Sequence, residues 1–169
     1  MLKSLSLFTL ILLFSTITYA QSSADTTGKH SPVRTLTYQQ YQAYLKGEAG
    51  NDMAKVAEMN HYPMPDKVLK WRNELDLSPI QIKKITEINT YMHRRRLQNG
   101  GSVIDTERKL DSLFKHNKLD DGTLVFYATR YGNYQGELKN AILQACLSTQ
   151  KLLSPQQITR LESLQKPSW

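Results

Sequence analysis

The sequence predicts an all-α protein, and three observations indicate this fold class. Apolar residues recur three and four positions apart along most of the chain after residue 65, the spacing that gives a helix one buried face. Glycine and proline are sparse inside these segments, and clusters of β-branched residues are few. The motif Leu-Ser-Pro-x-Gln, which is typical of a helix start, occurs at residues 77–81 and again at 153–157.

The repeated motif has the residues of a capping box. In the first copy we expect Ser78 to be the N-cap and Pro79 the first helical residue, where its missing N–H removes no hydrogen bond. Gln81 then reaches back to the N–H of Ser78, and Leu77 takes part in a hydrophobic staple. The second copy consists of Leu153, Ser154, Pro155 and Gln157, and LTYQQ at residues 36–40 lacks only the proline. Because a cap contributes about 1 kcal/mol, the motif predicts helix starts and not a reaction.

Six helical segments follow from these signals and from the apolar spacing. They are expected over residues 38–46, 66–75, 79–98, 103–116, 121–151 and 155–165. We expect Asn99-Gly100-Gly101 to end the third segment. Residues 21–35 are polar without apolar periodicity, which indicates a disordered tail. Two prolines within residues 60–65 indicate a turn.

The segment 121–151 is the most regular, with Asp120 as its expected cap. Its apolar seam alternates steps of four and three: Leu124, Ala128, Tyr131, Gln135, Leu138, Ile142, Ala145, Thr149 and Leu152. A helix of this length extends for about 45 Å, more than one small protomer covers, so the seam predicts dimerisation. Gly132 and Gly136 lie inside this helix, where each costs roughly 1 kcal/mol relative to alanine. Either the close approach of another helix or a local bend would explain them.

The first 20 residues have the pattern of a secretory signal peptide. A basic residue precedes an apolar run, and cleavage is expected after Ala20. Gln21 follows instead of cysteine, which argues against a lipoprotein and predicts an exported, periplasmic protein without stable membrane insertion. We divide the chain into this signal peptide, a polar and partly disordered extension with a short helix (21–62), a helical domain (63–165) and a tail (166–169).

Charge and cysteine content restrict the partners. Removal of residues 1–20 takes away one basic and no acidic residue, which leaves an excess of six positive charges. Since an exported chain rarely meets nucleic acid, anionic proteins or membrane surfaces are the expected partners. Cys146 is the single cysteine, so an internal disulfide is excluded. It is expected to be a small packing residue, with intermolecular oxidation as the alternative.

The pattern from residue 63 to 165 resembles the LTxxQ family of exported helical proteins, which includes the Spy and CpxP stress proteins and the related metal-responsive proteins ZraP and CnrX. The resemblance rests on LSPIQ and LSPQQ, with a hairpin and a long amphipathic helix containing ELKNAILQACL between them. It implies a four-helix, hairpin-like protomer that forms a cradle-shaped homodimer. It also implies an ATP-independent chaperone of the envelope stress response. This chain has serine where the family often has threonine, and residues 21–62 have no clear counterpart.

In such a chaperone, unfolded or partly folded proteins are the clients. Basic side chains would attract them at long range, and adaptable apolar side chains would contact them. The candidate client-binding residues are Met92, Arg94, Arg95, Arg96, Arg108, Lys109 and Phe114, and Lys115 and Lys118 add to the basic group. The alternative for each arginine is an ordinary solvated helix face.

A metal site is the main competing hypothesis. Met59, His61 and Met64 lie within six residues, and thioether and imidazole ligands suit copper, with zinc as a second possibility. The alternative is that Tyr62, Pro63 and Met64 only pack the linker onto the hairpin. We expect no cofactor, because His93, His116 and Cys146 lie far apart in the sequence.

No enzyme is predicted, because the sequence lacks a nucleophile elbow, a phosphate-binding loop, a zinc-protease pair and a dinucleotide fingerprint. The expected function is therefore that of an exported chaperone. Two alternatives are a periplasmic accessory protein for copper or zinc resistance or sensing, and a CpxP-like regulatory binder of one membrane sensor.

Overall fold

The computed structural model describes residues 30–165, so the expected signal peptide and the tail at 166–169 lie outside the described residues. Within that range the elements are α1 (Tyr38–Leu45), the 3-10 helix η1 (Asn51–Ala54), α2 (Lys55–Glu58), α3 (Pro65–Lys70), α4 (Pro79–Lys115), α5 (Asp121–Gln150) and α6 (Pro155–Gln165). All regular structure between residues 30 and 165 is helical, which confirms the predicted fold class.

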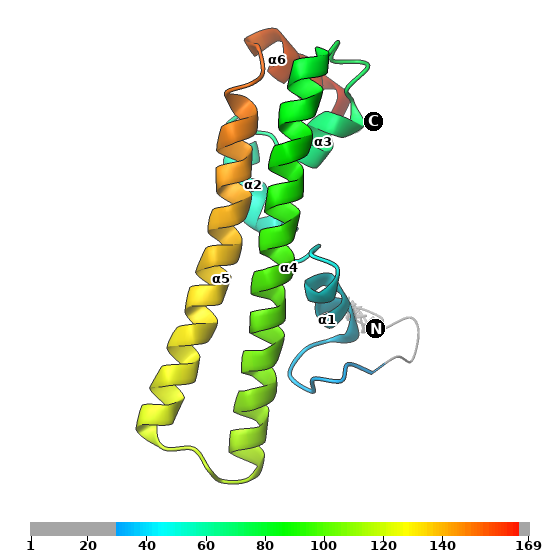
Figure 1. Ribbon diagram of the computed structural model, residues 1–169. Coiled ribbons are helices and arrows are strands. Elements are labelled where there is room, and N and C mark those ends of the chain that lie inside the picture. The colour runs from blue at the N-terminus through cyan, green and yellow to red at the C-terminus, as the bar shows by residue number, and fades with distance from the viewer. Residues whose placement is uncertain (1–29, 166–169) are drawn as a thin grey trace, which may run out of the picture.

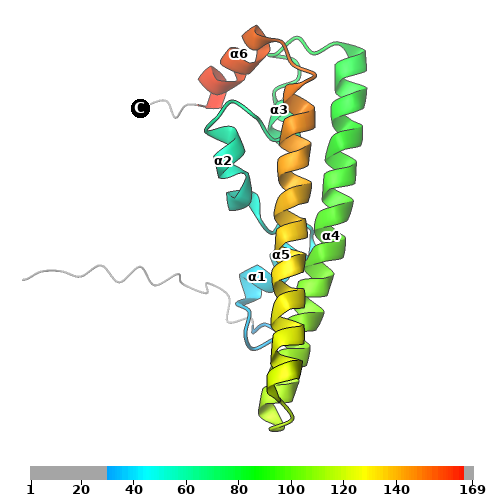
Figure 2. The same cartoon turned by 90° about the vertical axis from the view of Figure 1, so that its left-hand side faces the viewer.

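Two long helices form the frame of the protein. α4 and α5 run side by side in opposite directions and are joined by residues 116–120 at the tip, far from α3 and α6 (Figure 1). We call this pair and its loop the hairpin. The short helices α1, α2 and α6 lie on one side of it (Figure 2). The 37 residues of α4 correspond to a length of about 55 Å.

The predicted helix starts are confirmed. Ser78 Oγ accepts from the N–H of Gln81 at 3.2 Å, and the Ser78 N–H donates to Gln81 Oε1 at 2.9 Å. The same two bonds join Ser154 and Gln157 at 3.2 and 2.9 Å. Thr37 and Gln40 form the third capping box, and Asp120 caps α5 by accepting from the N–H of Thr123 at 2.7 Å. Each box satisfies two N–H groups that have no partner within the helix.

The two capping glutamines also bind one another, which the sequence did not predict. Gln81 Nε2 donates to Gln157 Oε1 at 2.9 Å and to the carbonyl of Leu152 at 2.7 Å. Gln157 Nε2 donates in return to Gln81 Oε1 at 3.4 Å and to the carbonyl of Leu75 at 3.2 Å. We call this pair the glutamine clasp. It joins two motifs 76 positions apart into one unit at the start of α4 and α6.

An apolar cluster lies at the same end of the hairpin as the glutamine clasp. Its buried members are Val68, Leu75, Leu77, Ile85 and Leu161, and Ile82, Leu152 and Leu153 pack against them. These residues come from α3, α4, α6 and the segments that lead into them. Burying side chains of this size stabilises the fold by about 1.5–3 kcal/mol each. Apolar burial therefore stabilises this end of the hairpin, and the directional hydrogen bonds of the clasp fix how the starts of α4 and α6 are oriented.

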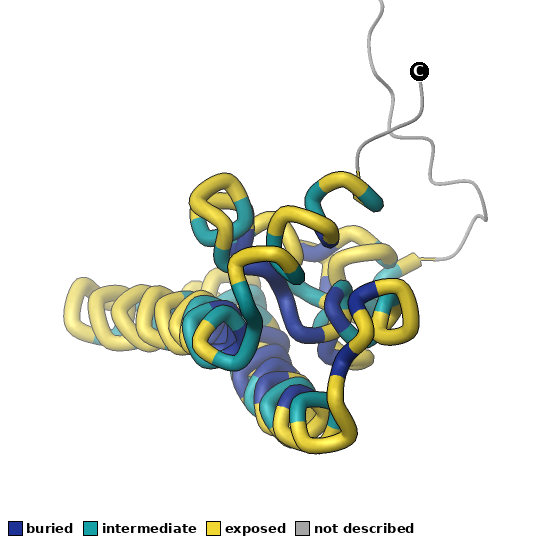
Figure 3. Tube along the Cα trace, turned by 90° about the horizontal axis from the view of Figure 1, so that it is seen from above, coloured by how far each residue is buried: buried dark blue, intermediate teal, exposed yellow. Residues whose placement is uncertain are grey.

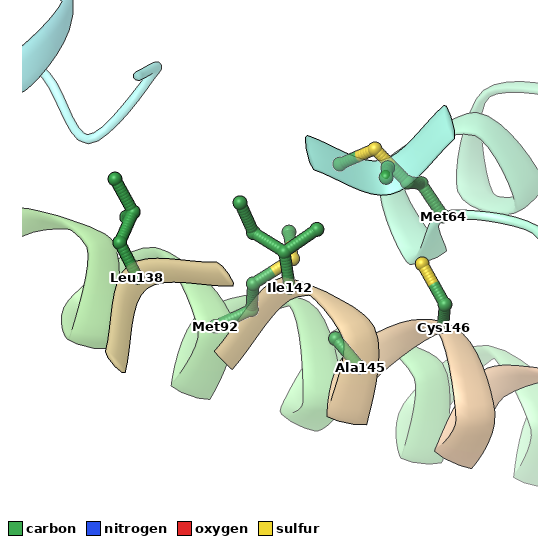
Figure 4. Packing of buried hydrophobic residues seen from close by; sticks show 7 residues of the cluster. Met64, Met92, Leu138, Ile142, Ala145 and Cys146 are labelled. Carbon is green, nitrogen blue, oxygen red and sulfur yellow. The ribbon is translucent and has the colours of Figure 1, made fainter. Parts of the chain in front are cut away.

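The main core lies between the hairpin and the short helices (Figure 4). It consists of Ala54, Met64, Met92, Leu138, Ile142, Ala145 and Cys146. Ala54 of η1 is fully buried there, and Val33 is buried in a smaller cluster with Leu36 and Ile104. Residues 30–62, which the sequence suggested as a polar extension, thus pack onto the hairpin in the described structure.

Two predicted helix ends are wrong. The helix expected over 66–75 ends at Lys70 as α3, and turns follow it. Residues 99–101 do not end a helix, because α4 continues through them to Lys115 and replaces the two helices expected over 79–98 and 103–116. Gly100 is buried, and a Cβ atom on it would lie 2.8 Å from the carbonyl oxygen of Tyr44. The glycine is there because the backbone of α1 approaches α4 at this point. The neighbouring Gly101 has open space instead.

Replacing either glutamine of the clasp with alanine should destabilise the fold. We expect Gln81→Ala and Gln157→Ala each to lower the free energy of unfolding by about 1–3 kcal/mol, because partly buried groups lose their partners. The double variant should lose less than the sum of the two, since each removes the same mutual bonds. Urea unfolding measures this, with exposed Gln156→Ala as the control, and additive losses would contradict the clasp.

Alanine substitutions at the two adjacent glycines of α4 should change the free energy of unfolding in opposite directions. Gly100→Ala places a methyl group against the Tyr44 backbone and should lower the free energy of unfolding by about 1–3 kcal/mol. Gly101→Ala has free space and should raise that energy by up to about 1 kcal/mol, the helix propensity difference. Thermal unfolding of both variants compares them directly, and equal effects would show that α1 does not pack closely there.

Candidate binding surface at the hairpin tip

The seam of α5 is buried over only part of its length. Leu138, Ile142, Ala145 and Thr149 are buried, whereas the stretch 121–137 contains no buried residue. Seen from above, buried residues gather where the short helices cover the hairpin, and the projecting part of the hairpin is mostly exposed (Figure 3). The α5 seam therefore continues beyond the surface that the protomer covers.

Large apolar side chains are exposed at this uncovered end. Phe114 on the last turn of α4 is 59% exposed, and Val125 and Phe126 at the start of α5 are 64% and 52% exposed. Soluble proteins tolerate single exposed apolar residues, but several at one end of an element indicate a contact surface. We call Phe114, Val125, Phe126 and the neighbouring Arg130 the hairpin-tip surface.

Arg130 lies between two aromatic rings. Its guanidinium carbon is 5.3 Å from the ring centre of Phe126 and 5.7 Å from that of Tyr134, and its Nη2 donates to the Tyr134 hydroxyl at 2.6 Å. The three residues are four positions apart, so they lie along one face of α5. Stacking orients the guanidinium, and within residues 30–165 Arg130 forms no ion pair with a carboxylate.

The rings of α5 face a shallow groove between the two long helices. α5 contributes Phe126, Tyr127, Arg130 and Tyr134 to its walls, and α4 contributes Ser102, Asp105 and Thr106. Phe126 and Tyr127 meet edge to face with ring centres 5.1 Å apart. The groove combines apolar rings with hydroxyl and charged groups, the mixture that peptide-binding surfaces present.

Two of the expected client-binding residues are buried. Met92 is 2% exposed and packs in the main core with Leu138 and Ile142, so it does not offer an adaptable surface contact. Arg96 is 5% exposed and donates to the carbonyl of Ala49 at 3.1 Å and to Asn51 Oδ1 at 2.6 Å. Burial lowers the pKa of Arg96, although the guanidinium stays charged. Its role is to hold the segment before η1 against α4.

The other expected residues remain at the surface in different surroundings. Arg95 bridges to Glu137 across the hairpin at 2.9 Å, and Arg108 pairs with Asp105 at 3.6 Å. Arg94 is exposed and lies 5.3 Å from the ring centre of Tyr91. Lys109 and Phe114 are exposed near the tip. Lys109 and Phe114 lie near the end of α4. Neither of them takes part in an ion pair like those of Arg95 and Arg108.

The expected metal ligands have three different environments. Met64 is buried in the main core, Met59 is 71% exposed, and His61 Nδ1 lies 2.5 Å from Glu162 Oε1 at the surface. Among residues 30–165, no group of three or more His, Cys, Asp or Glu side chains could hold a metal ion. The packing alternative for Met64 fits the burial of this side chain, and the three expected ligands lie in different surroundings.

Three residues of the hairpin-tip surface were not predicted from the sequence. Val125, Phe126 and Arg130 were missed, and the available signal was the spacing of Phe126, Arg130 and Tyr134 along one helical face. The imperfect seam position Gln135 also has a structural role, because its Nε2 donates to the Tyr44 hydroxyl at 2.7 Å and links α5 to α1.

Comparison of the chain with protein-family models, characterised proteins and solved structures gave no match. The resemblance to the LTxxQ family thus rests on the two motifs and their helical context. None of the helices within residues 30–165 has the length and apolar character to cross a membrane.

Cys146 should be almost unreactive in the folded protein. Burial raises the pKa of its thiol from 9.0 to about 11, with Glu58 and Asp66 adding to the effect. At pH 8 the thiolate fraction is then about 100-fold below that of a free thiol. An aromatic disulfide reagent should modify Cys146 quickly when urea unfolds the protein. In the folded protein the reaction should be at least about 100-fold slower. Rapid modification of the folded protein would show that the thiol is accessible, and Cys146→Ala supplies the blank.

Proposed function

We propose that this protein is an exported, ATP-independent chaperone-like binder of unfolded or partly folded proteins, with the hairpin-tip surface as its contact site. The observation that carries the proposal is the uncovered end of the hairpin. No residue of 121–137 in α5 is fully buried within the protomer, and Phe114, Val125 and Phe126 expose large apolar side chains at this end of the hairpin. Such a surface stabilises a partner by removing apolar side chains from water.

The charges near the tip favour encounter with anionic segments. Lys109, Lys115, Lys118 and Arg130 are exposed there. The nearby acids are partly engaged, since Asp120 caps α5 and Asp111 pairs with Arg34. Unpaired positive charge raises the rate of association more than the final affinity, and the effect decreases with salt. The apolar side chains then supply the contact that holds a client.

A homodimer is part of the proposal. The seam residues Leu124 and Ala128 are exposed in the protomer, and Gly132 and Gly136 have nothing within 4 Å of a Cβ atom. A helix of a second copy could therefore approach α5 closely along the exposed face that carries Leu124, Ala128, Gly132 and Gly136, which follow one another at steps of four. Phe126 and Arg130 lie off the seam positions, so a client and a second copy would use different faces of α5. Sedimentation equilibrium measures the oligomeric state.

Removing an exposed ring at the tip should weaken protection of clients. The purified protein should suppress aggregation of two unrelated denatured proteins, measured by light scattering, at near-stoichiometric ratios. Phe126→Ser should raise the ratio needed for half-protection by about fivefold, the effect of losing an aromatic contact worth more than 1 kcal/mol. Protection should also weaken as salt is raised.

Ile80→Ser is the matched control, because Ile80 is 67% exposed at the other end of α4. It should change the ratio less than twofold. Equal loss in both variants would remove the tip as the site, and absence of protection at any ratio would refute the function. Binding to one membrane protein with no effect on generic clients would instead indicate a dedicated regulator.

A further inference from the structure

A segment near the start of the described chain covers part of the hairpin. We call residues 30–46 the strap; it comprises an irregular stretch and α1. Val33 and Leu36 are 3% and 8% exposed and form a cluster with Ile104 of α4. Tyr41 and Tyr44 pack against this cluster. The strap therefore removes an apolar face of α4 from water.

Polar contacts line the same face toward the tip. Arg34 makes a two-pronged contact with Asp111, with Nη2 to Oδ1 at 2.5 Å and Nε to Oδ2 at 3.2 Å. The hydroxyl of Thr35 donates to Glu107 Oε2 at 2.5 Å. Arg34 is 68% exposed, so its ion pair is a surface contact of modest strength. The strap is thus held by a few apolar side chains, by surface bonds that water can replace, and at α1 by Tyr44, whose hydroxyl accepts from Gln135 of α5 at 2.7 Å.

The face beneath the strap continues into the hairpin-tip surface. Ile104, Glu107 and Asp111 follow one another at steps of three and four, which places them on one face of α4. The next position in that series is Phe114, an exposed member of the hairpin-tip surface. If the strap leaves, it uncovers a mixed face from Ile104 to Phe114, with the carboxylates of Glu107 and Asp111 between the two apolar side chains.

A hinge separates the strap from the fixed core. Gly47 and Gly50 have φ angles of +64° and +82°, a conformation that other residues rarely adopt. Directly beside them, buried Arg96 holds Ala49 and Asn51 against α4. α1 itself contains no buried residue. Opening at the hinge therefore breaks fewer contacts than global unfolding, as for other locally opening segments.

We propose that the strap occupies the α4 face from Ile104 to Phe114 as an internal ligand, and that it swings out about Gly47–Gly50 so that a client segment replaces it. The strap proposal rests on the proposed function, and it specifies which client segments the covered face of α4 prefers. By analogy with Val33, Arg34 and Leu36, the preferred segments carry two apolar residues three positions apart with a basic residue between them. The basic residue would pair with Asp111, and the apolar pair would cover Ile104.

A covalent link between strap and hairpin provides the first test. In Thr35→Cys/Glu107→Cys with Cys146→Ala, a short bismaleimide joins the strap to α4. The linked protein should protect clients at least about threefold less well than the same unlinked variant, since opening precedes binding. Equal protection by the two forms would overturn the strap proposal and leave the proposed function intact.

Charge reversal provides a second test without added cysteines. Arg34→Glu should improve protection by about two- to fivefold, the change in an opening equilibrium that follows loss of a surface ion pair. Arg34→Lys keeps a positive charge beside Asp111 and should leave protection within about twofold of the original level. Equal improvement in Arg34→Lys and Arg34→Glu would contradict the role assigned to this ion pair.

Hydrogen exchange separates failure of the strap from failure of the proposed function. Addition of an unfolded client should speed amide exchange in residues 38–46 of the unmodified protein and leave residues 138–150 unchanged. Protection without faster exchange in the strap would overturn the strap proposal alone. A protein that protects no client and shows no exchange response would overturn both.

Discussion

The glutamine clasp is the contact on which the arrangement of the helices depends. Each glutamine serves two purposes at once: its oxygen closes a capping box at its own helix, and its nitrogen reaches the other motif. Because side-chain amides are directional, the pair sets how α4 and α6 begin relative to one another. Apolar burial around Leu75, Ile85 and Leu161 stabilises this end but would tolerate other orientations.

From that end, packing decreases along the hairpin. Near the clasp, α3 packs on both long helices and Leu161 of α6 joins the apolar cluster there. Further along, η1 and α2 pack on α5, and α1 packs on α4. Beyond the strap, within residues 30–165, the two long helices pack only against each other. A pair of helices buries one stripe on each, so the outer faces of 121–137 stay in water. This surface is uncovered because the short helices do not extend to the tip of the two long helices.

Under the proposed function, this gradient places the stable core and the client-binding surface in different parts of the hairpin. The buried thiol of Cys146, the methionines of the core and Arg96 all serve the covered region, where the chain needs dense packing. The exposed rings and Arg130 lie outside this covered region. A protein that accepts varied partners benefits from such a division, because the contact surface can change without loss of the core.

The sequence by itself determined the helical class, the starts of α1, α4, α5 and α6, and the extent of α5. These features depend on residues within a few positions of one another, such as Ser78 with Gln81, and local hydrogen bonds are visible in a motif. Only the tertiary structure decided that α4 continues through Gly100, that Met92 and Arg96 are buried, and that the two motifs meet. Each of these depends on a partner distant in the chain, Tyr44 for Gly100 and Gln157 for Gln81. Periodicity identifies an apolar face but not which part of it a neighbour covers, so the exposed end of α5 became apparent only when the short helices were in place.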